Sequence, residues 1–266
     1  MVKVRLVPVM LLREGMLVKS YQFKRFLPVG SPLNSIKFFN QWDVDEIVFL
    51  DITPGKSAKV GRLDDNYQRF DSLADYTQYI SKHCFVPLTV GGGIKSLKDM
   101  EILFKAGADK VSVNTLIHES PQILQQAAER FGKQALVASI DVKQRHDGKD
   151  EVVTGYGKEV TGFDAVSWAK KVEAWGAGEI LLNSIDRDGM MNGYDIQLAR
   201  AVTGAVKIPV IASGGAGNLE DCLGVIKEGR VSALAAASIF QYTQITPLNI
   251  KEYLAKFGVE TRVKKL

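Results

Sequence analysis

The chain alternates between two patterns of hydrophobic and polar positions. Short runs rich in Val, Ile and Leu are apolar at nearly every position, as expected of strands that are covered on both faces. Longer segments between them place apolar residues at helical spacing, and several open on Ser, Asp or Asn and close on Gly, which are usual helix start and stop signals. The predicted strands are 4–12, 46–53, 86–91, 110–114, 136–142, 179–184, 208–213 and 233–237.

The segments with helical spacing follow these strands one by one. They lie at 33–42, 70–83, 96–107, 120–132, 163–178, 195–204, 218–229 and 247–258. Eight strand–helix units in a chain of 266 residues fit the size and rhythm of a (β/α)₈ barrel, which typically has about 250 residues. The predicted fold class is therefore α/β, as a TIM barrel.

An internal repeat favours this barrel over an open, doubly wound sheet. "EIVFLDIT" at 46–53 matches "EILLNSID" at 179–186, and "VPLTVGGGIKSLKD" at 86–99 matches "IPVIASGGAGNLED" at 208–221. Such self-similarity indicates a duplicated architecture. We expect a single barrel domain over 1–266, built from two half-barrels at approximately 1–130 and 131–266. The polar stretches 21–32 and 54–69 are predicted to be long loops that contact the ligand.

Composition and charge narrow the classes of partner. Hydrophobic residues make up 46% of the chain and charged residues 24%, and the formal net charge is +4. No apolar run approaches the roughly 18 residues of a membrane span, and no basic stripe is interleaved with aromatic residues, so we expect neither membrane insertion nor nucleic-acid binding. The start lacks the apolar core of a signal peptide, and two cysteines suggest no disulfide framework, so a cytoplasmic location is expected.

Two glycine-rich turns are candidate anion sites. "TVGGGIKS" and "IASGGAGN" follow equivalent strands of the two halves, and each leads into a helix, where bare backbone N–H groups bind anions. Small or hydroxyl residues end the next strand in each half. The expected phosphate residues are Gly92, Gly93, Asn114 and Thr115 on one side and Gly214, Gly215, Ala237 and Ser238 on the other. The alternative is that small residues merely allow tight packing.

Carboxylates at strand ends are the candidates for proton transfer. Asp51 and Asp141 each follow an apolar run, whereas Asp188 and Gly189, in the polar loop "SIDRDG", are expected to line the second phosphate site or to hold a ribose hydroxyl. A carboxylate in a dry pocket has a raised pKa and can move protons, although a lone Asp can also cap a loop. No Ser-His-Asp arrangement or metal cluster stands out, which indicates chemistry without a metal or cofactor.

Four charged residues begin strands at the opposite end of the predicted barrel. They are Arg5, Glu46, Lys110 and Glu179, two cations and two anions. Around a narrow barrel they can form a mutually neutralised ring, which permits partial burial of charge. The alternative is a solvated rim of unrelated ion pairs.

These residues and motifs resemble the cyclase subunit of imidazole glycerol phosphate synthase over nearly the whole chain. The shared sequence motifs include "DEIVFLDIT", "TVGGGI", "GADKVSVNT", "GAGEILLNSIDRDG" and "IPVIASGGAG". The resemblance implies a barrel that binds a bisphosphate ribonucleotide and receives ammonia from a glutaminase docked at its N-terminal face. It implies that the four charges form an ammonia gate, and that Lys19, in a loop, lines the ligand pocket. Asp51, Asn183 and Ser213 are expected to line the same pocket.

The chain departs from this family at a catalytic position. The resemblance places two catalytic acids at the ends of strands one and five, where this chain has Leu11 and Asp141. Leucine cannot transfer a proton, and general acid–base catalysis is worth about 10²–10⁴ in rate. The chain is more similar to cyclase-like proteins associated with acetamidino modification of bacterial surface sugars, which work with a glutaminase and a separate amidotransferase. A histidine-pathway cyclase and a non-catalytic module that binds a phosphorylated metabolite remain the alternatives.

Overall fold

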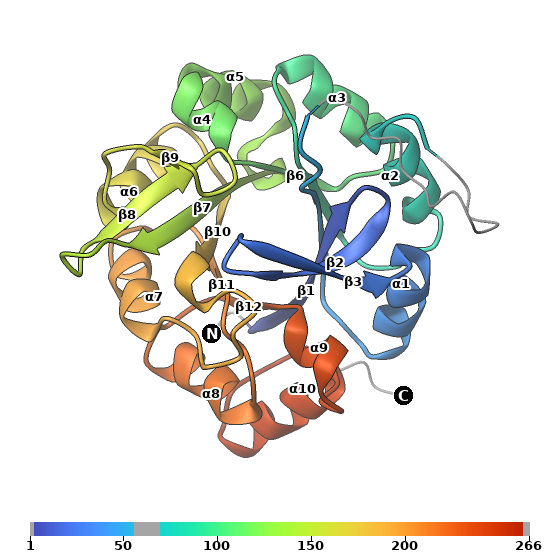
Figure 1. Cartoon of the computed structure of the whole chain (residues 1–266), viewed down its shortest axis with the longest axis vertical. Coiled ribbons are helices and arrows are strands. Elements are labelled where there is room, and N and C mark those ends of the chain that lie inside the picture. Colours follow the sequence, from blue (N-terminus) through green and yellow to red (C-terminus); the bar gives the residue numbers. More distant parts are fainter. Residues whose placement is uncertain (1–2, 56–69, 263–266) are drawn as a thin grey trace.

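A computed structural model describes residues 3–55 and 70–262 of the chain, and its parallel strands close into a barrel surrounded by helices (Figure 1). The barrel strands pair in the order in which they are named, and the last pairs with the first. The predicted (β/α)₈ barrel is therefore confirmed. The strands are β1 (Arg5–Arg13), β4 (Ile47–Asp51), β5 (Leu88–Gly91), β6 (Lys110–Val113), β7 (Leu136–Gln144), β10 (Glu179–Ser184), β11 (Val210–Ser213) and β12 (Ala233–Ala236).

The outer helices follow from the capping residues in the sequence. The side chains of Ser72, Ser96, Asp164, Asp195, Asn218 and Thr246 each accept a backbone N–H of the first helical turn, which satisfies a donor that the helix leaves free. The helices are α1 (Pro32–Gln41), α2 (Leu73–Ser81), α3 (Leu97–Lys105), α5 (Gln122–Phe131), α6 (Ala165–Ala174), α7 (Ile196–Thr203), α8 (Leu219–Lys227) and α10 (Pro247–Lys256). All eight predicted helices are present.

The short elements that the sequence did not predict include two short α-helices at matching places in the two halves and two 3₁₀ turns at different places. The five-residue helices α4 (Thr115–Glu119) and α9 (Ser238–Tyr242) follow β6 and β12, and 3₁₀ turns η1 (Lys133–Ala135) and η2 (Ile185–Arg187) precede β7 and follow β10. Both short helices begin at predicted phosphate residues.

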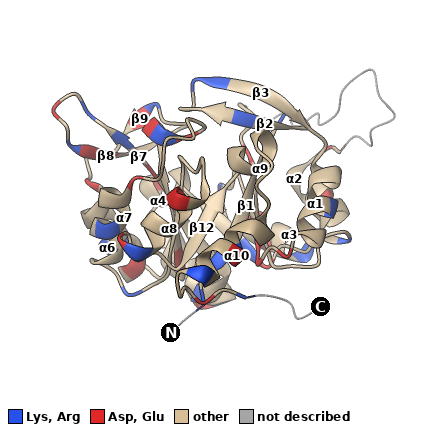
Figure 2. Cartoon of the chain, turned by 90° about the horizontal axis from the view of Figure 1, so that it is seen from below, with Lys and Arg blue, Asp and Glu red and all other residues tan. Residues whose placement is uncertain are grey.

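The loop prediction for 21–32 is wrong, because this stretch belongs largely to a β-hairpin. Strand β2 (Met16–Tyr21) pairs antiparallel with β1 and with β3 (Arg25–Gly30). Strand β7 carries a similar extension, in which β8 (Asp150–Thr154) pairs with β7 and with β9 (Glu159–Val160). Both hairpins stand at the same end of the barrel (Figure 2). The other predicted loop, 54–69, lies outside the described residues except for its first two positions.

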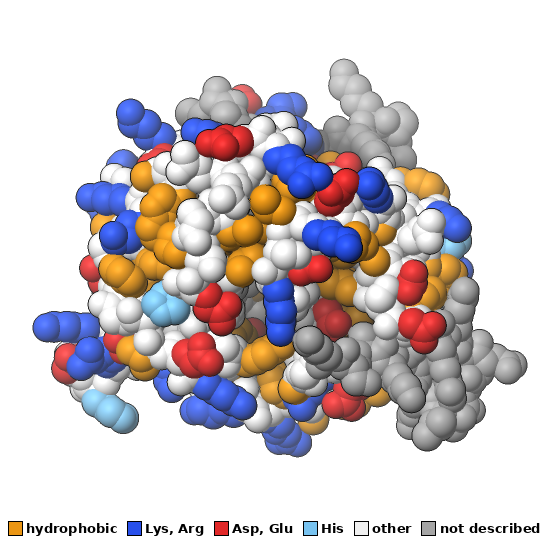
Figure 3. Space-filling model, turned by 90° about the horizontal axis from the view of Figure 1, so that it is seen from above, with side chains coloured by type: hydrophobic (Ala, Val, Ile, Leu, Met, Phe, Trp, Pro, Cys, Tyr) orange, Lys and Arg blue, Asp and Glu red, His pale blue; other side chains and the backbone are white. Residues whose placement is uncertain are grey.

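Two layers of apolar side chains hold the barrel together. A large cluster lies between the strands and the helices and includes Phe49, Met100 and Trp168. A smaller cluster fills the barrel interior. On the outer face shown in Figure 3, basic and acidic side chains are interspersed with scattered apolar ones. Among the described residues, no helix is long and apolar enough to span a bilayer.

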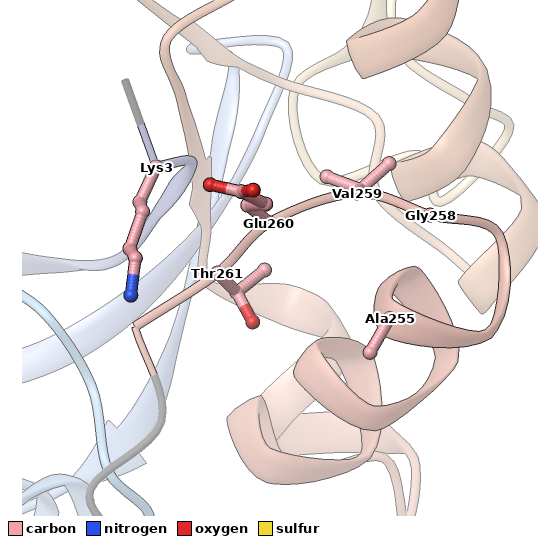
Figure 4. A pocket seen from close by; sticks show the side chains of 6 residues that line it. All are labelled: Lys3, Ala255, Gly258, Val259, Glu260 and Thr261. Atoms are coloured by element: carbon pink, nitrogen blue, oxygen red, sulfur yellow. The ribbon is translucent and has the colours of Figure 1, made fainter. Parts of the chain in front are cut away.

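A surface pocket lies beside the start of β1, away from the hairpins. Its volume is about 410 Å³. The pocket holds no predicted site residue, so the candidate site is elsewhere. Its lining consists of Lys3, Ala255, Gly258, Val259, Glu260 and Thr261 (Figure 4).

Candidate functional site

The candidate site is built by side chains that point into the barrel. Alternate residues of each strand face inward, and they form layers along the barrel axis. The middle layer is apolar and consists of Val7, Val9, Val48, Val137, Leu181, Ile211, Ala233 and Ala235. Inward positions further along the strands face the C-terminal mouth, which is the end where barrels of this kind bind ligands.

Asp141 is the central carboxylate of the mouth. Its Oδ2 accepts a hydrogen bond from Asn114 Nδ2 at 2.6 Å, and its Oδ1 accepts one from Asn183 Nδ2 at 3.2 Å. Asp141 keeps some contact with solvent, but its carboxylate is surrounded by protein, and this desolvation raises its pKa to about 7. The negative charge of Asp188 also raises the pKa, whereas the hydrogen bonds from the two amides lower it. Asp141 can therefore give or take a proton near neutral pH.

Leu11 faces Asp141 from the opposite side of the barrel. Strand β1 is four strands away from β7 in the ring of eight, and the Leu11 side chain packs with Leu50 against the apolar middle layer. At the two positions where the resemblance implies catalytic acids, the structure therefore places one carboxylate, Asp141, and one apolar side chain, Leu11.

The first predicted anion site brings its four residues to adjacent strand ends. Gly92 lies against the end of β4, since a Cβ there would come within 2.1 Å of the Asp51 carbonyl oxygen, whereas a Cβ at Gly93 would meet no atom within 4 Å. Asn114 is bonded to Asp141, and the Thr115 hydroxyl accepts the Gly155 N–H at 3.3 Å. The turn is therefore open at Gly93, and the candidate acid is contacted by Asn114 at the next strand end.

The second predicted anion site has the same place in the other half. Gly214 and Gly215 follow β11, and Gly215 accepts the Gly193 N–H at 2.8 Å. Ala237 precedes the short helix α9, and Ser238 begins it and is buried. Ser213 pairs in register with Asn183, the residue that donates to Asp141. The two sites are therefore connected through the Asp141 hydrogen bonds.

Asp188 and Gly189 are covered by the β2–β3 hairpin. Burial raises the pKa of Asp188 to about 6, against hydrogen bonds from the Ser20 side chain and the Phe23 backbone and the charge of Lys19. Gly189 allows this close approach, because a Cβ there would lie 1.9 Å from the Ser20 carbonyl oxygen. The sequence did not indicate Ser20 or Phe23, since their partners are about 165 residues away.

Lys19 and Asp51 lie in local surroundings that differ from those expected from the sequence. Lys19 lies in strand β2, so the expectation of a loop lysine is wrong, and its buried ammonium sits 4.3 Å and 4.0 Å from the ring centres of Tyr21 and Tyr242. Asp51 accepts the Thr53 N–H at 2.9 Å, and burial raises its pKa. This bond makes Asp51 a cap of its own turn, the alternative role that strand-end carboxylates can take.

The four charges at the N-terminal end form a closed ring. Arg5 contacts Glu46 at 2.8 Å and also Glu179, while Lys110 contacts the same two carboxylates at 2.9 Å and 2.8 Å. The Thr89 hydroxyl donates to Glu46 at 2.6 Å. The side chains are only 3–19% exposed, so each charge is neutralised by two opposite ones at the bottom of the barrel interior. Unrelated solvated pairs do not describe this geometry.

The pKa of Asp141 yields a stability prediction. The folded-state pKa of about 7 lies above the ordinary aspartate pKa of 3.8, so the folded protein binds this proton more readily than the unfolded chain does, and stability falls as the pH rises between these values. We expect Asp141→Asn to increase the free energy of unfolding at pH 8 by about 1–3 kcal/mol, with little gain at pH 4. Urea unfolding at both pH values measures this.

The matched control for this variant is Asp147→Asn, on the exposed turn between β7 and β8. It should leave stability unchanged at both pH values. A gain for Asp141→Asn that is equal at pH 4 and pH 8 would show that the carboxylate titrates normally.

No group of three or more His, Cys, Asp or Glu suited to a metal ion is found within residues 3–55 and 70–262. A comparison with protein families finds one match that covers most of the chain: the model described as "Histidine biosynthesis protein" matches residues 5–246. The matched span includes both anion turns, Asp141, Leu11 and the charged ring.

Proposed function

The chain belongs to the histidine biosynthesis protein family of barrels, and from this premise we propose that it is the synthase subunit of a glutamine amidotransferase complex. A glutaminase docks at the N-terminal face and releases ammonia, which passes the charged ring and reaches a phosphorylated acceptor at the mouth. The favoured reaction is acetamidino modification of a nucleotide-linked surface sugar, together with a separate amidotransferase.

The observation that carries this proposal is the closed ring of Arg5, Glu46, Lys110 and Glu179. Four partly buried charges at a barrel end stabilise the fold little, because desolvation opposes their attraction. They do place polar, mutually neutralised groups at the entrance to an apolar interior. A neutral, hydrogen-bonding molecule of the size of ammonia fits such an entrance better than an ion does.

Residues at the mouth can bind the acceptor that receives the ammonia. Asp141 is held by Asn114 and Asn183 and titrates near pH 7, so it can accept the proton that the ammonia nitrogen loses after attack on the acceptor carbon. The glycine turns on both sides supply backbone N–H groups for the phosphates of the acceptor. Leu11 leaves the opposite wall without an acid, which argues against the two-acid ring closure that the resemblance implies.

A histidine-pathway cyclase is the second candidate. The near-neutral pKa of Asp141 favours it, since a single well-tuned carboxylate can serve as both acid and base. A module that only binds a phosphorylated metabolite is the third candidate, and it requires neither the ring nor a partner.

The ring provides the experiment that tests the proposal. In the complex with its glutaminase, Lys110→Ala should leave glutamine hydrolysis intact but release most of the ammonia to solution, because two glutamates then lose one of their two cations. Free ammonium and glutamate are measured together. Lys98→Ala on the exposed face of α3 is the control. If Lys110→Ala and Arg5→Ala change nothing although both variants fold, the binding-module alternative is supported instead.

A further inference from the structure

The turn 155–157, between β8 and β9, lies at the C-terminal mouth of the barrel, where it contacts residues that follow β4 and β6. Its sequence is Gly-Tyr-Gly, and all three residues have left-handed backbones, with φ values of 57°, 62° and 77°. Glycine adopts this conformation freely, but a tyrosine in it is uncommon and strained. Nothing in the local turn geometry requires the aromatic side chain, so a different role must explain Tyr156.

The turn touches several elements that surround the first anion site. The Gly155 N–H donates to the hydroxyl of Thr115, and the Tyr156 hydroxyl donates to the carbonyl oxygen of Thr53 at 3.2 Å. A Cβ at Gly157 would lie 3.2 Å from Phe23, in the turn of the β2–β3 hairpin. Tyr156 therefore bridges from the end of β8 to the segment after β4, and its neighbour Gly155 contacts Thr115 of the first anion site.

The Tyr156 side chain is not used to fill the core. Tyr156 remains 46% exposed, and partial burial, together with the charge of Asp51, raises the pKa of its phenol. The Tyr156 hydroxyl stays protonated and is held by its hydrogen bond to Thr53, while much of the residue is open to solvent. A fixed, half-exposed aromatic ring beside an anion turn offers flat apolar contact area next to groups suited to phosphate.

We propose that Tyr156 contacts the phosphorylated acceptor and selects molecules that carry a sugar ring next to the phosphate. The phosphate lies at Gly93 and Thr115, and the apolar C–H face of the sugar stacks on the tyrosine ring. This inference rests on the proposed function for the identity of the acceptor, and it adds the residue that distinguishes a ring-bearing acceptor from an open chain.

Binding of two small phosphates tests this role directly. We expect the protein to bind N-acetylglucosamine 1-phosphate about tenfold more tightly than glycerol 1-phosphate in titration calorimetry, the size of one good aromatic contact. Tyr156→Gly should remove this preference without weakening glycerol 1-phosphate, and it should fold because glycine adopts a φ of 62° without strain. Tyr156→Phe keeps the ring and should retain the preference.

The control is Tyr253→Phe, which changes a tyrosine on α10 that bonds Glu220 on the outer surface and should bind as wild type does. The proposal is overturned if wild type shows no preference, if Tyr156→Gly keeps it, or if that variant loses both ligands equally, since the last result means a purely structural turn. Failure of ammonia transfer would appear in the Lys110→Ala experiment and leaves these binding results unaffected.

Discussion

Leu11→Asp is expected to raise the rate of ammonium-dependent cyclase turnover by about 10²–10⁴ over the wild-type protein, which should be near background. The variant supplies an acid on β1 opposite Asp141, at the place where Leu11 now packs with Leu50. The β1 and β7 sides of the mouth then each carry a carboxyl group that can transfer a proton. Steady-state product formation from the bisphosphate ribonucleotide with external ammonium measures the change, and no glutaminase is needed.

Two controls make this result specific. Leu11→Asn has the shape of aspartate but cannot transfer a proton, so it should stay at background. Leu50→Asp places an acid on the neighbouring strand and should give little turnover, because β4 is three strands from β7. Robust wild-type turnover would instead support the histidine-pathway cyclase, with proton transfer through Asp141 alone.

The sequence predicted the barrel because its signals are local. Each strand is a short apolar run, and six of the eight long helices begin at a residue whose own side chain caps them, so neither signal needs knowledge of distant contacts. The charged residues of the ring were also predictable as a group, because they begin strands, and strand starts of a parallel barrel meet at one end.

The hairpins do not follow from the amino-acid composition of their segments, because a hairpin depends on which strands pair. The segment 21–32 is polar enough to suggest a loop, yet its residues 25–30 pair with β2, in which Leu17 and Val18 are buried against the barrel. In the second hairpin, the Asp-Gly pair at 147–148 between two β-rich runs is a known hairpin signal. That signal could have identified β8.

The side-chain contacts at the mouth could not be predicted from local sequence patterns. Asn114 was expected to bind phosphate, but its side-chain amide donates to Asp141, a residue 27 positions away. Tyr156 lies between two glycines in a stretch without any chemical motif, and this turn contacts Thr53, which follows β4, and Thr115, which begins α4. Only the closed barrel brings these residues together.

A second large effect is expected at Lys251 in α10, which is fully buried. Its ammonium lies 3.1 Å from Asp45 Oδ1 and 3.2 Å from Asp43 Oδ2, and it also donates to the Asp43 carbonyl oxygen. Lys251→Ala should lower the free energy of unfolding by about 3–5 kcal/mol, because it leaves carboxylates in a buried place without this cation. Urea unfolding at pH 8 measures the loss, and exposed Lys256→Ala on the same helix is the control.

The pH dependence separates lost charge from lost packing. Burial already raises the pKa of Asp45, and without the lysine cation its pKa should rise further, so the folded variant binds a proton more readily than the unfolded chain. The deficit of Lys251→Ala should therefore shrink as the pH falls from 8 to 5. Lys251→Met keeps most of the apolar volume and should show the same pH dependence; a deficit that Met restores fully at pH 8 would point to packing alone.

The same network links α10 to the charged ring. The Asp45 carboxylate accepts the Leu6 N–H at 2.8 Å, and the Asp45 N–H donates to the Leu6 carbonyl at 3.0 Å. Leu6 follows Arg5 and Asp45 precedes Glu46, so these bonds fix the backbone of two ring residues relative to each other. In Lys251→Ala, the spacing between Arg5 and Glu46 should therefore loosen before the barrel unfolds, and hydrogen exchange at the Leu6 amide should rise more than exchange at the Val48 amide.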